Sequence, residues 1–162
     1  MSPKGPDLSV DLSVDVSVAD EGWREIVPAI DEIFKRVKAV LPDTVLPAAS
    51  QEVSLVLTDD AAIRRLNRDY RGKDAATNVL SFPTIEAPGL LGDIVLARET
   101  IMREAADKGA SFKSHVTHLI IHGLLHLLGH DHQTEAEAAV MEAIEIAALA
   151  KLGIANPYVL KA

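Results

Sequence analysis

The sequence predicts an α+β fold: a single domain with one mixed β-sheet of about four strands packed against helices. Two observations favour it. The spacing of apolar residues alternates between a period of two, typical of strands, and a period of 3.6, typical of helices, and the predicted elements follow the order β-α-β-α-β-β-α-α-α. The chain of 162 residues, 48% of them hydrophobic, is long enough for one substantial core. We therefore expect one domain over residues 1–162, with residues 1–7 flexible.

The N-terminal segment predicts a strand followed by a helix. Residues 7–19 repeat Asp, Leu, Ser and Val with strict polar and apolar alternation, which indicates a strand with one buried face. Its aspartates would discourage pairing with other chains if the strand lies at a sheet edge. Residues 23–40 have helical spacing, and Pro28 is compatible with a helix only in the first turn or at a kink.

A second strand and a second helix follow. Residues 52–57 alternate again, and Thr58 is a plausible N-cap for the helix that comes next. The expected apolar stripe of this helix consists of Ile63, Leu66 and Tyr70.

The C-terminal half predicts two more strands and three helices. Strands are expected at residues 77–82 and 92–97, and a helix at residues 98–108. Ser111 is expected to cap a very apolar helix that runs to about residue 128, and Thr134 to cap a last helix that reaches about residue 151. The apolar helix is expected to be central. The last helix carries acidic residues that we expect to form an ordinary solvated face: Glu135, Glu137, Glu142 and Glu145.

Charge and composition narrow the class of protein. The net charge of −8 disfavours indiscriminate nucleic-acid binding, although a local basic patch remains compatible with it. The N-terminus lacks the apolar run of a signal peptide, and the most apolar segment, residues 116–128, is too short to span a bilayer. The absence of Cys fits a reducing compartment. We expect a cytoplasmic protein that does not bind membranes.

Three histidines carry the strongest functional signal. His122 and His126 lie one turn apart on the predicted apolar helix, and Gly129 can end that helix so that the chain returns His132 towards them. Three imidazoles and one open position form the ligand set of a catalytic zinc ion, whereas structural zinc sites have four protein ligands and usually contain Cys. We expect one Zn²⁺ per chain, with a zinc-bound water as the reactive group. Any one of these histidines alone would more often be a core or surface residue.

The residue after the first histidine argues against a protease. The spacing H-x-x-x-H-x-x-G-x-x-H is also that of the metzincin proteases, which carry Glu directly after the first His as general base. In this chain that position is Gly123, which cannot accept a proton. A zinc metallohydrolase of another substrate, such as a peptide, is therefore the weaker alternative, and no side-chain base is assigned with certainty.

The helix expected after residue 58 is basic. Residues 61–73 contain five basic side chains against Asp69 alone, a local charge of +4. Such a face either binds phosphate groups or is simply solvated. The candidates for contact with a phosphate-bearing substrate are Arg64, Arg65, Arg68 and Lys73, with Arg71 at the end of the same helix.

Four segments together make the chain resemble the YbeY family of bacterial endoribonucleases. They are residues 66–74 (Leu-Asn-Arg-Asp-Tyr-Arg-Gly-Lys-Asp), residues 77–83 (Thr-Asn-Val-Leu-Ser-Phe-Pro), residues 91–94 (Leu-Gly-Asp-Ile) and the histidine segment 122–132. The position of His130 is often Tyr in that family, and Ala75-Ala76 stands where a proline is frequent.

The resemblance implies a function. It implies an α+β fold, zinc held by His122, His126 and His132, an arginine at position 71 that is needed for activity, and a basic groove for RNA. The expected activity is single-strand-specific cleavage of a ribosomal RNA precursor, in maturation of the 3′ end of 16S rRNA and in ribosome quality control. The expected partners are the small ribosomal subunit and its assembly factors. A ribosome-associated factor with a structural metal and little nuclease activity is the other alternative.

The remaining polar residues near the motif have less definite roles. His118 lies one turn before His122 and is expected to support a ligand from behind or to pack in the core. Asp131 is expected either to orient a ligand imidazole or to be a turn residue. His115 and His130 are expected at the surface or facing a substrate.

Overall fold

The computed structural model describes residues 11–47 and 49–159, and its elements follow the predicted order. The expected flexibility of residues 1–7, and the first residues of the strand expected at 7–19, lie outside the described residues. The elements are β1 (Leu12–Val18), a short 3₁₀ helix (Glu21–Ile26), α1 (Val27–Val40), β2 (Gln51–Thr58), α2 (Asp60–Arg71), β3 (Val79–Pro83), β4 (Leu90–Ala97), α3 (Arg98–Lys108), α4 (Phe112–Leu127) and α5 (Glu135–Lys151).

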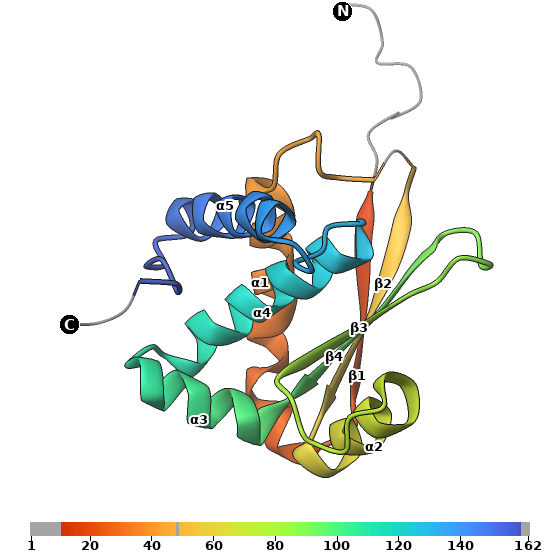
Figure 1. Ribbon diagram of the computed structural model, residues 1–162, viewed down its shortest axis with the longest axis vertical. Helices are drawn as coiled ribbons and strands as arrows, with labels where there is room; N and C mark the ends of the chain where they lie inside the picture. Colours follow the sequence, from red (N-terminus) through yellow and green to blue (C-terminus); the bar gives the residue numbers. More distant parts are fainter. Residues whose placement is uncertain (1–10, 48, 160–162) are drawn as a thin grey trace, which may run out of the picture.

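The sheet is mixed, as predicted. Its strand order is β1-β2-β4-β3, with β1, β2 and β4 parallel and β3 antiparallel to β4. β1 is an edge strand with Asp15 exposed on its solvated face, which agrees with the expectation that its aspartates discourage further pairing. β3 forms the other edge. Figure 1 shows the long connection between β3 and β4 extending away from the body of the molecule.

Helices cover both faces of the sheet. Alternate residues of β4 separate the two sides: Ile94 and Leu96 join the large core with α1 and α4, while Val95 and Ala97 pack with Ile63 of α2 on the opposite side. Figure 1 shows α2 apart from the group formed by α1, α3, α4 and α5. The basic helix and the histidine helix therefore lie on opposite faces of one sheet.

α4 is the central helix, as predicted. It packs against β3 and β4 as well as α1, α3 and α5, and most of its residues are buried. Ser111 caps it, with its hydroxyl accepting a hydrogen bond from the Ser114 backbone N–H. None of the helices in the described parts of the chain combines the length and the apolar character needed to cross a membrane.

Two local predictions about α2 are wrong. The N-cap is Asp59, whose carboxylate accepts from the Ala62 backbone N–H at 2.9 Å, because Thr58 still belongs to β2. Tyr70 was expected in the buried stripe but is 70% exposed; Asn67 is buried instead and donates to the Ala75 carbonyl at 2.9 Å. The buried face of α2 thus includes a polar side chain that fixes the following loop.

The N-terminal helix begins differently from the prediction at residue 23. A 3₁₀ helix (Glu21–Ile26) leads into α1, so that Pro28 lies in the first turn of α1, where its missing N–H leaves no intrahelical bond unmade. Trp23 anchors this entry, because its indole N–H donates to the buried Thr58 carbonyl at 2.8 Å.

Candidate metal centre

The structure brings His122, His126 and His132 together. One nitrogen of each imidazole lies within 4.8 Å of the corresponding nitrogens of the other two. The Nε2 atoms of His122 and His126 are 3.2 Å apart, and the ring of His132 lies 4.9 Å from that of His126 between centroids. Two of the three residues are partly buried, and His132 is exposed.

The turn after α4 places the third histidine. Gly129 has a φ of 98°, in the left-handed region that the sequence analysis expected there. The His130 N–H donates to the Leu125 carbonyl and the Gly129 N–H to the His126 carbonyl, which is the pair of hydrogen bonds of a Schellman motif. The Asp131 carboxylate then accepts from the His132 backbone N–H at 2.7 Å. Asp131 therefore stabilises the turn, and among the described residues its carboxylate makes no hydrogen bond to an imidazole.

The separation of the first two imidazoles suits two ligands of one metal ion. Two imidazole nitrogens at the usual zinc–nitrogen distance and a tetrahedral angle lie about 3.3 Å apart, close to the separation observed between His122 and His126. Burial lowers the pKa of His126, and the nearby His122 and His132 lower it further. A neutral imidazole is the form that binds a metal, so this environment favours a ligand over a protonated side chain.

Gly123 faces the sheet and not the histidines. A methyl group at this position would lie 3.0 Å from Ile94 Cγ2 and 3.1 Å from Ser81 Oγ. The Ser81 hydroxyl donates to the Gly123 carbonyl at 3.2 Å, so β3 and the helix backbone are in direct contact here. The absence of a protease-type base is therefore built into the packing: a longer side chain would enter the core.

The solvated role predicted for Glu145 is wrong. This residue of α5 is fully buried, and its carboxylate lies 2.6 Å from His118 Nε2 and 3.3 Å from His122 Nδ1. A signal was available in the sequence, because Glu145 occupies the same helical stripe as Met141, Ala148 and Leu149, all of which are buried. A single carboxylate in an apolar stripe indicates a buried partner.

His118 and His115 lie behind the ligands. His118 is buried; its Nε2 lies 2.6 Å from the Glu145 carboxylate and 3.2 Å from the Tyr158 hydroxyl, and its ring lies edge-on to that of His122 at 6.3 Å between centroids. The surface position predicted for His115 is wrong: it is 3% exposed and pairs with Glu104 at 2.8 Å. Burial lowers the pKa of His115 despite that contact. His130 is partly buried.

Arg71 is connected to the histidine helix through β3. Its guanidinium donates to the Ser81 carbonyl at 2.8 Å and lies 5.4 Å from the centre of the Phe82 ring. Because the Ser81 side chain bonds to Gly123, between His122 and His126, one strand residue links Arg71 to the metal helix. α2 itself is on the other face of the sheet.

The other basic residues of α2 are not equivalent. Arg64 makes two hydrogen bonds to the Asp74 carboxylate, at 2.7 and 3.2 Å, and Arg68 bonds to Asp69 at 3.0 Å. Among the described residues, no side-chain hydrogen bond or ion pair is recorded for Arg65 or Lys73. Two of the four predicted RNA contacts are thus partly neutralised, and two present a full positive charge.

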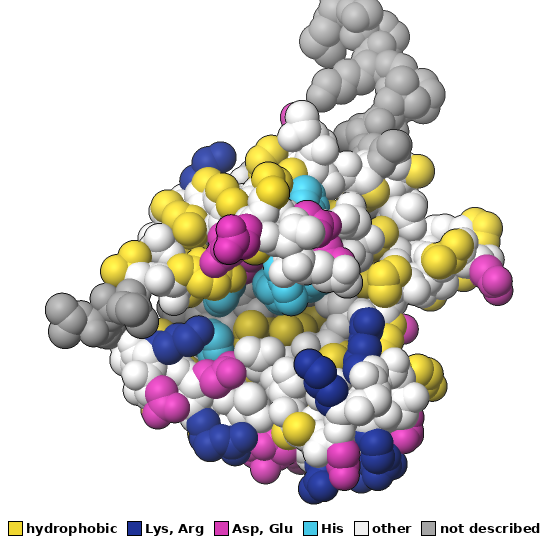
Figure 2. Space-filling view, in the orientation of Figure 1, with side chains coloured by type: hydrophobic (Ala, Val, Ile, Leu, Met, Phe, Trp, Pro, Cys, Tyr) yellow, Lys and Arg dark blue, Asp and Glu magenta, His cyan; other side chains and the backbone are white. Residues whose placement is uncertain are grey.

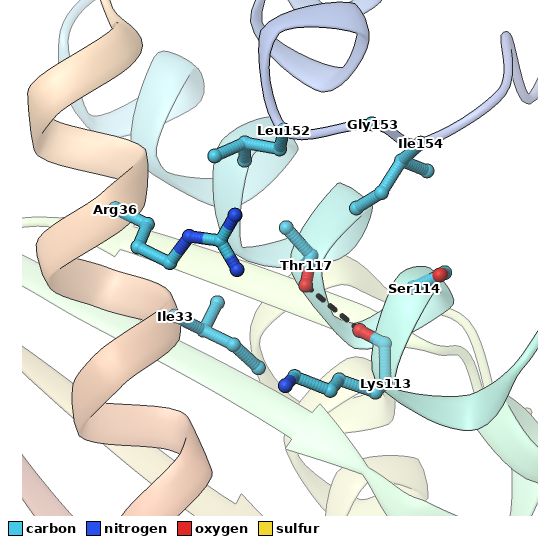
Figure 3. A pocket seen from close by; sticks show the side chains of 8 residues that line it. All are labelled: Ile33, Arg36, Lys113, Ser114, Thr117, Leu152, Gly153 and Ile154. Atoms are coloured by element: carbon cyan, nitrogen blue, oxygen red, sulfur yellow. Dashed lines mark hydrogen bonds between the residues drawn. The ribbon is translucent and has the colours of Figure 1, made fainter.

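A hollow lies beside the histidines. A cavity of about 320 Å³ is lined by His122, His132, Ala138, Met141, Glu142, Glu145 and Tyr158. Figure 2 shows histidine side chains in a hollow of this face, with acidic side chains above it and most of the Lys and Arg side chains below it. A separate hollow of about 210 Å³ between α1 and the start of α4 contains Arg36 and Lys113 but none of these histidines (Figure 3).

The packing at Gly123 generates the first prediction. Gly123→Glu should destabilise the fold by more than about 4 kcal/mol, because it forces an unpaired carboxylate into the core against Ile94. Thermal unfolding measures this. The matched control is Ala139→Glu on the exposed side of α5, which should change stability by less than about 0.5 kcal/mol. A stable Gly123→Glu chain with normal melting temperature would contradict the packing argument.

Comparisons with known proteins agree with the geometry. The sequence profile of the family described as Endoribonuclease YbeY matches residues 16–153. The chain is 46% identical over 160 residues to the Endoribonuclease YbeY of Rhizobium johnstonii, covering 91% of this chain and 94% of that relative. It is 53% identical over 134 residues to that of Sphingopyxis alaskensis, covering 74% and 80% of the two chains.

A solved structure supports the fold independently. The solution structure of a protein from Thermotoga maritima matches 86% of this chain and 91% of its own length, with a TM-score of 0.53 and 21% sequence identity. At that identity the match concerns the fold alone. The family profile and the curated relatives extend over most of the chain, including all three histidines, and the chain belongs to the Endoribonuclease YbeY family.

Proposed function

We propose that this protein is a zinc-dependent endoribonuclease that cleaves single-stranded RNA. The observation that carries the proposal is the clustering of three imidazoles, together with an exposed arginine that is connected to the same helix through Ser81. The relatives are named as endoribonucleases, which are phosphodiester hydrolases. His122, His126 and His132 are the proposed ligands of one Zn²⁺ per chain.

The histidines and Arg71 have different roles in the proposed reaction. A zinc ion held by three imidazoles supplies a Lewis acid and lowers the pKa of a coordinated water to about 7. Arg71 supplies the complementary function: one of its N–H groups is bonded to Ser81, and the rest of the fork can donate to the non-bridging oxygens of a phosphodiester. These oxygens gain negative charge during cleavage, so the contact strengthens as the bond breaks.

The face of α2 is the proposed path for the RNA backbone. Arg65 and Lys73 provide unpaired positive charges close in sequence to Arg71, and Arg64 and Arg68 add charges that their acidic partners partly neutralise. The molecule as a whole carries a net charge of −8. A localised basic surface on an acidic protein favours contact with RNA at this face and disfavours it elsewhere.

The proposed substrate is a ribosomal RNA precursor. The name of the family supports an RNA substrate. We further propose, from the resemblance described above, the small ribosomal subunit and its assembly factors as the partners and the cytoplasm as the compartment. Hydrolysis of a peptide is disfavoured, because Gly123 faces the sheet and leaves no base beside the first histidine.

The metal generates the second prediction. Purified wild-type chain should contain one zinc per molecule by elemental analysis, and His126→Ala should lose most of it. Removal of zinc from the wild type should lower the melting temperature, because zinc that binds only the folded chain raises the free energy of unfolding. The increase is about 4 kcal/mol when the zinc concentration is a thousandfold above Kd. His130→Ala is the matched control, since it removes a neighbouring imidazole outside the cluster. Full zinc content in His126→Ala would contradict the assignment.

Arg71 generates the third prediction. Arg71→Ala should keep its zinc and its melting temperature, while cleavage of single-stranded RNA falls by on the order of 10²–10³, as for loss of one donor to a developing anion. Arg71→Lys should recover little, because a point charge does not reproduce the planar fork. RNA affinity should fall less than the cleavage rate. The His126→Ala chain from the same preparation controls for contaminating ribonuclease.

Two results would assign Arg71 differently. Normal cleavage by Arg71→Ala would show that the contact with the phosphate is unimportant. Loss of zinc together with a lower melting temperature would show that the bond to Ser81 makes Arg71 a structural residue.

The ion pairs of α2 generate the fourth prediction. Arg65→Ala should weaken RNA binding for all sequences and reduce the slope of log K against log salt by about 0.7, the value for one phosphate contact on a single strand. Arg64→Ala should change it less, because Arg64 is already bonded to Asp74. Arg36→Ala, in the hollow of Figure 3, is the control and should leave the slope unchanged. Equal slopes for wild type and Arg65→Ala would identify α2 as an ordinary solvated face.

A further inference from the structure

A hydrogen-bonded cluster with two buried members lies next to His122 of the proposed metal centre. It joins Glu145 of α5, His118 of α4 and Tyr158 from the segment that follows α5. The Glu145 carboxylate lies 2.6 Å from His118 Nε2 and accepts from the Tyr158 hydroxyl at 2.8 Å; its two oxygens lie 3.3 and 3.5 Å from His122 Nδ1. Side chains from α4 and from the segment after α5 therefore meet at the carboxylate of Glu145 on α5.

The carboxylate is surrounded by hydrogen-bonding side chains. Glu145 is fully buried, and two imidazoles and a phenol lie within hydrogen-bond distance of its oxygens. Burial and the bond to Glu145 raise the pKa of Tyr158, so its hydroxyl remains a donor. Among the described residues, no Lys or Arg pairs with Glu145. In the described part of the chain, the hydrogen bonds that offset the cost of burying this carboxylate therefore come from the two imidazoles and the phenol.

An ionised carboxylate determines which nitrogen of each ring carries a proton. A carboxylate only accepts hydrogen bonds, so the atoms that face it, His122 Nδ1 and His118 Nε2, are the protonated ones. His122 Nε2 is then left with its lone pair, and this is the atom that lies 3.2 Å from His126 Nε2. The other nitrogen of His118, Nδ1, is buried without a partner among the described residues. The hydrogen-bond partners of the His118 ring among the described residues are thus Glu145 and Tyr158.

We infer that Glu145 and Tyr158 are positioning residues for the metal: Glu145 orients His122 and selects the tautomer whose Nε2 can bind zinc, and Tyr158 holds Glu145 in place. The inference rests on the proposed metal site. Glu145 is not itself a ligand in this geometry, because it faces Nδ1 of His122, whereas Nε2 of that ring faces His126. Mutation of a residue that hydrogen-bonds to a metal ligand without touching the metal typically weakens metal affinity by about 10–100-fold. The C-terminal segment thereby becomes part of the metal centre.

The test measures zinc affinity of the full chain by competition with a chelator of known affinity. Glu145→Gln keeps the shape but removes the charge, and should bind zinc about 10–100-fold more weakly. Tyr158→Phe keeps the ring but removes one donor, and should bind zinc a few-fold to about tenfold more weakly. Glu137→Gln, on the exposed side of the same helix, is the matched control and should bind zinc as the wild type does.

A second readout does not depend on the metal. Nuclear magnetic resonance of the imidazole nitrogens in the zinc-free wild-type chain should show His122 protonated at Nδ1, and Glu145→Gln should show a mixture of both tautomers. A residue that merely filled space in the core would lower the melting temperature without changing this ratio. If Glu145→Gln does not fold, Tyr158→Phe decides, since the Tyr158 side chain is partly exposed.

The outcomes separate this inference from the proposed function. Tight zinc binding by the wild type and equally tight binding by both variants would overturn the inference and leave the zinc site intact. A wild-type chain that binds no zinc would overturn the proposed function, and the positioning role with it. Weaker zinc binding in both variants, with an unchanged control, supports the assignment.

Discussion

The close packing of α4 against the sheet at Gly123 is the constraint on which the rest of the site depends. The missing side chain lets the helix backbone approach Ile94 and accept a hydrogen bond from Ser81. One side of the helix thereby packs against the sheet. His122 and His126 project from another side, towards the third histidine and α5. The same contact explains why a metzincin-like histidine spacing exists here without the protease base: the position that would carry it is inside the core.

Ser81 connects two functions that the sheet would otherwise separate. α2 and α4 pack on opposite faces, so their side chains have no direct route to one another. β3 is an edge strand, and at this edge Ser81 offers its carbonyl to Arg71 and its hydroxyl to the histidine helix. A cation from one face is thus held in a defined relation to ligands from the other. This arrangement requires an edge, because an inner strand would have its backbone groups occupied by both neighbours.

The buried charge of Glu145 has a similar dependence on several elements. A carboxylate without partners would be costly in this core, and it is tolerated because α4 and the C-terminal segment bring three donors to it. The sign of the charge therefore differs between two parts of the site. On one side of His122 a fixed negative charge favours a cation, and on the outer surface the basic residues of α2 favour phosphate. The proposed sites for the metal and for RNA therefore differ in the sign of the charge that surrounds them.

The sequence by itself determined the order of the elements, the mixed sheet around a central apolar helix, the left-handed turn at Gly129 and the cluster of three histidines. These features depend on local spacing, which each segment carries in its own residues. Tertiary structure decided what each polar side chain meets. Glu145 has the helical spacing of buried residues and His115 was expected at the surface, but the spacing of neither residue shows which side chain it meets. Tyr70 has the spacing of a core residue and is exposed, whereas Asn67 is buried on α2. Helical spacing shows which residues share a face, but the packing of other elements determines whether that face meets solvent, a charge or the core.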